Sequence, residues 1–187
     1  MTHAPLIRGL FLAALRRPVI VSPTDQEAGI VLDEPLADVA PDSLADVELP
    51  VVVSAGGESY QVRATASGER AITGRVALVT GGAQGFGAEI AKGLVDQGCF
   101  VYIADLNGEG AAAKAAELGA DTTHPITVNV GDEDSVAAMT AEVERTTGGL
   151  DLVISNAGIV RAGPVLEQDL AAFKLSTDIN YVAFFLV

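Results

Sequence analysis

A glycine-rich stretch, TGGAQGFG at residues 80–87, constrains the fold more than any other feature of the chain. It directly follows a continuous apolar run, RVALV, which is typical of a strand buried on both faces of a parallel sheet. An amphipathic helix is predicted from about Gly85 to Gln97, and Gly98 follows where helices commonly end. Glycines placed between a buried strand and a helix N-terminus favour an anion, because free N–H groups and the helix dipole point toward it.

The glycines of this stretch have separate expected roles. Gly81 allows a tight turn, and Gly85 and Gly87 remove side chains that would hold a phosphate and the sheet away from the helix. Their spacing, G-x-x-x-G-x-G, differs from the more common G-x-G-x-x-G fingerprint. A turn that serves packing alone therefore stays open as an alternative.

Strand and helix patterns continue to alternate after this point. Further buried strands are predicted at 99–105, 125–130 and 150–158, with an Ala-rich helix at 108–119. Asp132 and Asp169 are predicted to cap two more helices. The side chains expected to face inward from the helices are Ile90, Ala91, Leu94, Val95, Val136, Met139, Val143, Leu170 and Phe173. Short connections between strands and helices predict an α/β fold with a doubly wound parallel sheet.

The first 70 residues have a different composition from the rest. Six of the eight prolines lie in the first 50 residues, and residues 18–62 hold nine acidic side chains and no Lys or Arg. A short helix ending before Pro18 and strands in VIVS, LPVVVSAGG and SYQVRAT are predicted. Residues 1–70 are therefore interpreted as a small accessory region or the trailing piece of a longer upstream domain. An Arg-bearing amphipathic leader at the N-terminus is the alternative.

Composition excludes several classes of partner. The chain has 11 Lys plus Arg against 25 Asp plus Glu, and its formal net charge of -14 disfavours nucleic acid and anionic membranes. The apolar segment before Pro18 is too short to cross a membrane, which takes about 20 residues. A single cysteine, Cys99, fits a reducing cytoplasm. No histidine cluster suggests a metal site.

Asp105 ends the second predicted strand of the regular part, 20 residues after Gly85. A carboxylate at this place can accept both hydroxyls of an adenosine ribose and would repel a 2′-phosphate. Since no Lys or Arg follows closely, the residue indicates NAD rather than NADP as cofactor. The alternative is that Asp105, like Asn107, caps the next helix.

These residues together resemble the short-chain dehydrogenase/reductase family. The stretch at 80–87 is similar to the family's TGxxxGxG cofactor loop, SNAG at 155–158 to its NNAG motif, and Asn129-Val130 to its Asp-Val pair beside the adenine. DINYVAFFLV resembles the helix that carries the family's structural and catalytic asparagine, here Asn180. The resemblance covers residues 74–187 and implies a partial Rossmann-type domain. The residues it assigns to cofactor binding are Gly81, Ala83, Gln84, Gly85, Phe86, Gly87, Asp105, Leu106, Asn129, Val130, Asn156, Ala157 and Gly158.

The resemblance also implies a reaction and a substrate class. Its nearest branch carries an N-terminal extension and includes enzymes similar to sorbitol-6-phosphate dehydrogenase and bifunctional rhamnulose-phosphate aldolase–dehydrogenase. The expected activity is NAD-dependent hydride transfer with a secondary alcohol or ketone, such as a polyol, sugar or sugar phosphate. The complete enzyme is expected to be a homo-oligomer. An aldolase remnant in residues 1–70 is the less favoured hypothesis, because that segment lacks metal-binding histidines.

The family's proton-transfer motif, Tyr-x-x-x-Lys, is absent from the sequence. The residues four positions after Tyr60, Tyr102 and Tyr181 are alanine, leucine and phenylalanine. The chain is therefore expected to be an N-terminal fragment with strand order 3-2-1-4, without the catalytic Ser, Tyr and Lys. The apolar residues Phe184, Phe185 and Leu186 are expected to make it aggregation-prone. A non-catalytic NAD-binding module is the alternative function.

Overall fold

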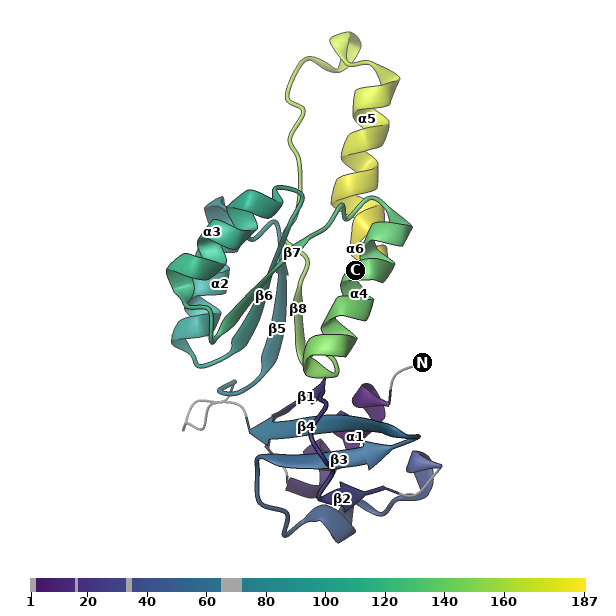
Figure 1. The fold of residues 1–187 in the computed structure, drawn as a ribbon. Helices are drawn as coiled ribbons and strands as arrows, with labels where there is room; N and C mark the ends of the chain where they lie inside the picture. Colours follow the sequence, from purple (N-terminus) through teal and green to yellow (C-terminus); the bar gives the residue numbers. More distant parts are fainter. Residues whose placement is uncertain (1–2, 16, 33–34, 65–71) are drawn as a thin grey trace. The chain divides into compact units, whose positions relative to one another are not determined.

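The computed structural model describes residues 3–15, 17–32, 35–64 and 72–187, and the chain divides into two compact units. The first unit comprises residues up to Val76 together with Gln97–Phe100 and Thr140–Asp151. The second unit comprises Ala77–Asp96, Val101–Met139 and Leu152–Val187. Figure 1 shows the elements of both units, coloured along the sequence. Thr65 and the predicted boundary near residue 70 lie outside the described residues.

The first unit is a four-stranded sheet with one long helix packed on it. Its elements are α1 (Ala4–Leu15), β1 (Val19–Pro23), β2 (Ile30–Val31), η1 (Leu36–Asp38), η2 (Pro41–Leu44), β3 (Val51–Ala55) and β4 (Glu58–Ala64). The strand order is β1-β4-β3-β2, and β2 alone runs parallel to its neighbour. The helix and the strands predicted here are confirmed. Ile7 and Phe11 of α1 pack with Val53, Tyr60 and Val62 in one apolar core.

A buried ion pair lies at one side of this unit. The Arg8 guanidinium of α1 donates to the Asp151 carboxylate at 2.7 Å and, through Nε, to the carbonyl of Val19 at 3.1 Å. The two charged side chains are only 6% and 10% exposed. Asp151 also accepts the N–H of Val76 at 2.8 Å and a longer contact from the more exposed Arg75. The carboxylate is therefore fully compensated by donors.

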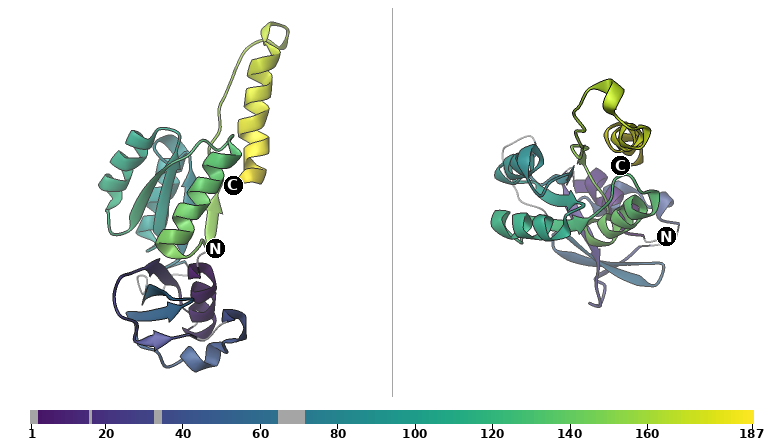
Figure 2. Two further views of the ribbon diagram at one scale, coloured as in Figure 1. Left: turned by 45° about the vertical axis from the view of Figure 1, so that its right-hand side comes forward. Right: turned by 90° about the horizontal axis from the view of Figure 1, so that it is seen from above.

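The second unit contains the parallel sheet. Its strands are β5 (Val76–Thr80, beginning in the first unit), β6 (Phe100–Asp105), β7 (Thr123–Thr127) and β8 (Leu152–Ile154), and its helices include α2 (Gly85–Asp96), α3 (Gly108–Leu118) and α4 (Glu133–Thr147). The strand order is β7-β6-β5-β8, which confirms the predicted order 3-2-1-4. In the views of Figures 1 and 2, α2 and α3 lie on one side of this sheet and the N-terminal half of α4 lies on the other.

Several details of the parallel sheet and its helices correct the sequence-based expectation. The buried strand predicted at 150–158 is observed only at Leu152–Ile154, and Val153 in it is 48% exposed. The strand predicted at 125–130 is observed at Thr123–Thr127, so Asn129 and Val130 follow the strand. Among the residues that the structure describes, β7 pairs only with β6, and Pro125 is tolerated there because a proline costs little on an edge strand. On α2, Ile90 is exposed, whereas Gly87, Ala88 and Ala91 are buried. Small residues form this face because the helix approaches the backbone of the preceding loop closely.

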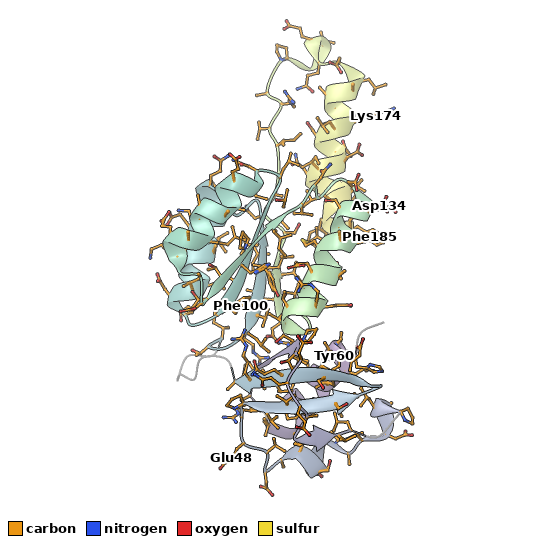
Figure 3. All side chains as sticks on the ribbon, viewed as in Figure 1. Glu48, Tyr60, Phe100, Asp134, Lys174 and Phe185 are labelled. Atoms are coloured by element: carbon orange, nitrogen blue, oxygen red, sulfur yellow. The ribbon has the colours of Figure 1, made fainter. Side chains whose placement is uncertain are left out.

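Figure 2 shows that the last helical segment extends beyond the sheet at one end. It consists of η3 (Val165–Glu167), α5 (Leu170–Thr177), a π-helical turn η4 (Asp178–Val182) and α6 (Ala183–Leu186). Asp169 caps α5 as predicted, but Leu170 and Phe173 do not face inward, since they are 67% and 60% exposed. No residue of α5 that the structure describes is buried. Phe185, labelled on α6 in Figure 3, is also exposed.

Within the described ranges, no helix combines enough length with enough apolar character to cross a membrane.

Candidate functional site

A cavity of about 670 Å³ opens at the carboxyl edge of the parallel sheet, within the second unit. Loops that follow β5, β6, β7 and β8 all contribute to it, and two residues come from the C-terminal helical segment. Its lining residues are Gly81, Gln84, Gly85, Phe86, Gly87, Asp105, Leu106, Val128, Asn129, Val130, Asn156, Ala157, Gly158, Ile159, Arg161, Leu175 and Ile179. This edge of a parallel α/β sheet is where ligands generally bind.

The glycine-rich loop between β5 and α2 has the geometry that its sequence predicts. Gly81 and Gly85 have positive φ angles of 65° and 58°, which glycine adopts without strain. A Cβ at Gly85 would meet nothing within 4 Å, so the approach to the helix N-terminus is open. A Cβ at Gly87 would overlap the carbonyl oxygen of Gly81 and lie 2.6 Å from Nδ2 of Asn156. Gly87 is thus required by close packing, and Gly85 by backbone conformation.

The start of α2 presents backbone donors to the cavity. The helical bond that opens the ladder joins the N–H of Ala88 to the carbonyl of Gln84. The N–H groups of Gly85, Phe86 and Gly87 belong to the first turn, where an α-helix offers its amides no intrahelical acceptor. An anion at this point would receive hydrogen bonds and the favourable end of the helix dipole.

Asp105 lies at the end of β6 and lines the same cavity as Gly85. Its Oδ2 accepts the N–H of Ala83 at 3.0 Å and its Oδ1 accepts the N–H of Asn107 at 2.9 Å. The cap of α3 is Asn107, whose side chain accepts the N–H of Gly110 at 3.0 Å. The alternative role of Asp105 as the helix cap is therefore wrong.

The SNAG segment after β8 is tied to the end of β5. The Thr80 hydroxyl accepts the N–H groups of Asn156 and Ala157, each at 3.0 Å. The Asn156 amide donates to the carbonyls of Thr80 at 3.0 Å and Gly81 at 3.3 Å. These bonds confirm that the Asn156 amide connects the two strands, and they bring the backbone of 156–158 to the cavity wall.

Asn180 lies in the π-helical turn and does not line the cavity directly. Its side-chain oxygen accepts the N–H of Ile159 at 2.9 Å, and its side-chain nitrogen donates to the carbonyl of Ile159 at 2.9 Å. A Cβ added at Gly158 would lie 3.0 Å from the Asn180 oxygen, so glycine allows this close approach. Asn180 is exposed, as the solvated alternative expected, but its amide has partners, because it holds the loop after β8.

The structure brings nearly all of the predicted binding residues to one cavity. Ala83 is the exception, since it lines a neighbouring hollow with Lys114 instead. The lining residues that the sequence analysis did not identify are Val128, Ile159, Arg161, Leu175 and Ile179. Ile159 and Arg161 follow the SNAG motif directly, which was an available signal. Leu175 and Ile179 have the i, i+4 spacing of an ordinary apolar helix face and gave no specific signal.

The donor set of the cavity suits an elongated anionic ligand with hydroxyl groups. Backbone amides face the middle of the edge, a carboxylate lies at the β6 end, and apolar side chains such as Leu106 and Ile179 supply contact area. Groups of three or more His, Cys, Asp and Glu side chains that could hold a metal ion are not found among the residues described.

The comparisons with known proteins agree with this arrangement. Residues 75–187 match the family described as short chain dehydrogenase. The chain is 40% identical over 108 residues to a 2-dehydro-3-deoxy-L-rhamnonate dehydrogenase (NAD(+)) from Sphingomonas sp. (strain SKA58), covering 57% of this chain and 43% of that protein. It is 37% identical over 118 residues to D-threitol dehydrogenase from Mycolicibacterium smegmatis, covering 62% and 45%.

A solved structure shows the same likeness. The 3-ketoacyl-(acyl-carrier-protein) reductase from Brucella melitensis, in a crystal structure complexed with NADH, superposes with a TM-score of 0.60 and 28% identity. That match covers 62% of this chain and 48% of the reductase. The chain thus spans less than half the length of each of these relatives.

Proposed function

Because the chain belongs to the short-chain dehydrogenase family, we propose that the cavity binds a nicotinamide adenine dinucleotide and that NAD is preferred to NADP. The observation that carries the proposal is the shared cavity of Gly85 and Asp105. The cavity combines amides at a helix N-terminus, which suit a diphosphate, with a carboxylate, which suits a ribose. Gly85 and Asp105 are 20 residues apart in the sequence, which fits a βαβ unit. The family's relatives are dehydrogenases, and one named relative uses NAD(+).

The state of Asp105 supports its proposed role at the ribose. Each of its oxygens accepts one backbone N–H, whereas a carboxylate offers about four lone-pair sites. One acceptor position on each oxygen therefore remains for a ribose hydroxyl. A 2′-phosphate at the same place would bring negative charge against the carboxylate, and Leu106 beside it supplies no cation.

The remaining cavity residues are proposed to position the dinucleotide. The amides of Gly85, Phe86 and Gly87 would hold its diphosphate, and Asn129 with Val130 would flank the adenine side. Asn156, Ala157 and Gly158 would form the wall toward the nicotinamide, with Asn180 acting through Ile159 to hold that wall in place. When bound, the dinucleotide supplies the hydride chemistry between a hydroxyl-bearing and a carbonyl-bearing carbon.

The proposed reaction is the oxidation of a secondary alcohol or reduction of a ketone on a polyol, sugar or sugar derivative. The similarity to enzymes named for 2-dehydro-3-deoxy-L-rhamnonate and D-threitol supports this class. The narrower branch with sorbitol-6-phosphate and rhamnulose-phosphate enzymes stays a prediction. A non-catalytic NAD-binding module is the second candidate, because none of the three tyrosines has a lysine four residues later.

The organisation of the whole protein is also a proposal. Residues 1–70 would form an accessory region, and residues 74–187 would form the first part of the NAD-binding domain. The complete enzyme would be a cytoplasmic homo-oligomer that acts on a small-molecule substrate, without nucleic acid or membrane as partner.

Titration of the chain with NADH and NADPH, followed by NADH fluorescence, tests the cofactor assignment. We expect NADH to bind more tightly than NADPH. Asp105→Ala should weaken NADH binding by about 10-fold or more, since hydrogen bonds to a charged group contribute roughly 1.5–3 kcal/mol. The variant should also narrow the preference for NADH, because the charge that repels a 2′-phosphate is gone.

Asp121→Ala is the matched control, because Asp121 is an exposed acid that does not line the cavity. It should leave both affinities within about twofold of the wild-type values. Tighter binding of NADPH than of NADH by the unmutated chain would contradict the role of Asp105. Failure to bind either dinucleotide would contradict the proposed function as a whole.

A further inference from the structure

Arg161 is a cationic side chain at the cavity that cofactor binding does not account for. Of the described lining residues, Asp105 and Arg161 are the ones that carry a formal charge. Arg161 is exposed, and no carboxylate within the described ranges forms an ion pair with it. In a chain with a net charge of -14, a cavity-lining arginine that is in no ion pair with the chain's own described carboxylates is open to an anionic ligand.

The backbone that carries Arg161 is held at two points. Asn180 binds both the N–H and the carbonyl of Ile159, two residues earlier. The Gln168 side chain donates to the carbonyl of Arg161 at 3.0 Å, with a longer contact to that of Gly163. The backbone at Arg161 is thereby held by side chains from the following segment, although it lies in no helix or strand.

The strand order places Arg161 far along the edge from the proposed ribose site. Asp105 follows β6, the glycine loop follows β5, and the segment with Arg161 follows β8, and these strands are adjacent in the order β6-β5-β8. A dinucleotide whose adenosine lies at Asp105 and whose diphosphate lies at the glycine loop extends its other end toward β8. Arg161, three residues beyond Gly158, is therefore on the side where a reacting substrate would meet the nicotinamide.

We propose that Arg161 determines substrate specificity by binding a carboxylate on the sugar or polyol substrate. This inference rests on the proposed dehydrogenase function and narrows its substrate class to sugar acids. A guanidinium pairs with a carboxylate through two parallel N–H···O bonds. A phosphate dianion carries two negative charges and would call for a second cation. Among the described lining residues, no lysine or arginine other than Arg161 supplies one.

The test uses this chain saturated with NADH, so that ligands bind without turnover. Isothermal titration compares D-gluconate, neutral D-sorbitol and sorbitol 6-phosphate. We expect D-gluconate to bind more tightly than either of the others. Arg161→Gln should weaken D-gluconate binding by about 10-fold or more, as expected for the loss of a charge-assisted bidentate contact, and should leave D-sorbitol unchanged.

Two further variants separate this role from a structural one. Arg161→Lys keeps the positive charge but loses the two parallel N–H donors of the guanidinium. It should therefore bind D-gluconate more tightly than Arg161→Gln does, but less tightly than the wild type. Arg63→Gln removes an exposed arginine of β4 in the first unit and should change nothing. The Kd of NADH should stay within about twofold of the wild-type value in all three variants.

The outcomes distinguish failure of this inference from failure of the proposed function. Equal D-gluconate affinity in wild type and Arg161→Gln, no D-gluconate binding at all, or tighter binding of sorbitol 6-phosphate would overturn the assignment while NADH still binds. A large loss of NADH affinity in Arg161→Gln would instead place the arginine on the diphosphate, which also overturns it. Failure of the wild-type chain to bind NADH would contradict the proposed function itself.

Discussion

In the first unit the charged side chains of Arg8 and Asp151 bind each other and are almost completely buried, whereas in the second unit Asp105 and Arg161 line a cavity. Both arrangements use one acid and one arginine. In the first, donors from Arg8 and Val76 compensate the carboxylate completely. In the second, backbone amides hold Asp105 in place but leave acceptor positions on both oxygens.

The difference lies in what surrounds each pair. The antiparallel part of the first unit closes over an apolar core formed by α1, β3 and β4, so a polar group there must find its partner within the protein. The carboxyl edge of the parallel sheet ends in glycine-rich and small-residue loops, which leave space beside the polar groups. Charge therefore serves stability in the first unit and recognition in the second, and substitutions should separate the two effects.

The largest expected effect is on the buried ion pair. Asp151→Ala leaves the Arg8 guanidinium buried without its counter-charge, which should lower the free energy of unfolding by about 3–5 kcal/mol. The matched control is Arg75→Ala, which removes the exposed partner of the same carboxylate and should cost less than about 1 kcal/mol. Urea denaturation followed by circular dichroism measures both. Similar costs for the two variants would contradict the stabilising role of the buried pair between Arg8 and Asp151.

The next effect concerns the close packing of Gly87 against Gly81. Gly87→Ala should lower the free energy of unfolding by about 1–3 kcal/mol through overpacking. It should also reduce NADH affinity about 10-fold, which corresponds to about 1.4 kcal/mol, because the loop must shift away from the helix. In Gly93→Ala on the same helix, the added Cβ would meet nothing within 4 Å. Because alanine favours a helix more than glycine does, this variant should be about 0.5–1 kcal/mol more stable, with unchanged NADH binding. Unaltered NADH binding by Gly87→Ala would show that the loop geometry does not matter to the ligand.

The smallest effect is expected at Cys99 in the first unit. Burial, and to a lesser degree the negative charge of Asp151, raises the pKa of this thiol. The folded chain should therefore react with a disulfide reagent at pH 8 more slowly than the urea-unfolded chain does. Because the raised pKa favours the protonated form of the folded state, its contribution to stability is present below the unfolded pKa of the thiol. That contribution is lost as the pH rises through the unfolded value toward the raised one. Equal rates in the folded and unfolded chain would contradict the burial argument.

Local sequence patterns predicted the elements of the parallel sheet, because buried strands and capped helices have strong signals, whereas the strand order 3-2-1-4 was implied by the family resemblance. Asp132 and Asn107 cap helices through their side chains, as residues of their type are expected to do. The prediction of which side chains are buried failed where tertiary contacts determine burial. Leu170 and Phe173 form an apolar helix face, yet periodicity alone does not say what a face packs against.

The candidate site was predictable to the extent that its residues follow strands directly. Asp105 and Gly85 could be found because strand ends and glycine spacing specify their positions, whereas Asn156 was found through the resemblance of SNAG to the family's NNAG motif. Leu175 and Ile179 could not, because only the path of the chain beyond β8 brings α5 and η4 back to the cavity. Ile90 was misjudged for a similar reason, since the buried face of α2 is set by the close approach at Gly87 rather than by side-chain size.

The hydroxyl of Thr80 has a consequence for how β5 and β8 can align. It is completely buried and accepts hydrogen bonds from two consecutive amides, so both of its lone pairs are occupied. If β8 slipped by one residue against β5, those amides would face Val79 or Gly81, whose side chains offer no acceptor. Slippage would remove the shared acceptor of both N–H groups, so this one threonine favours a single alignment of the strands beneath the cavity.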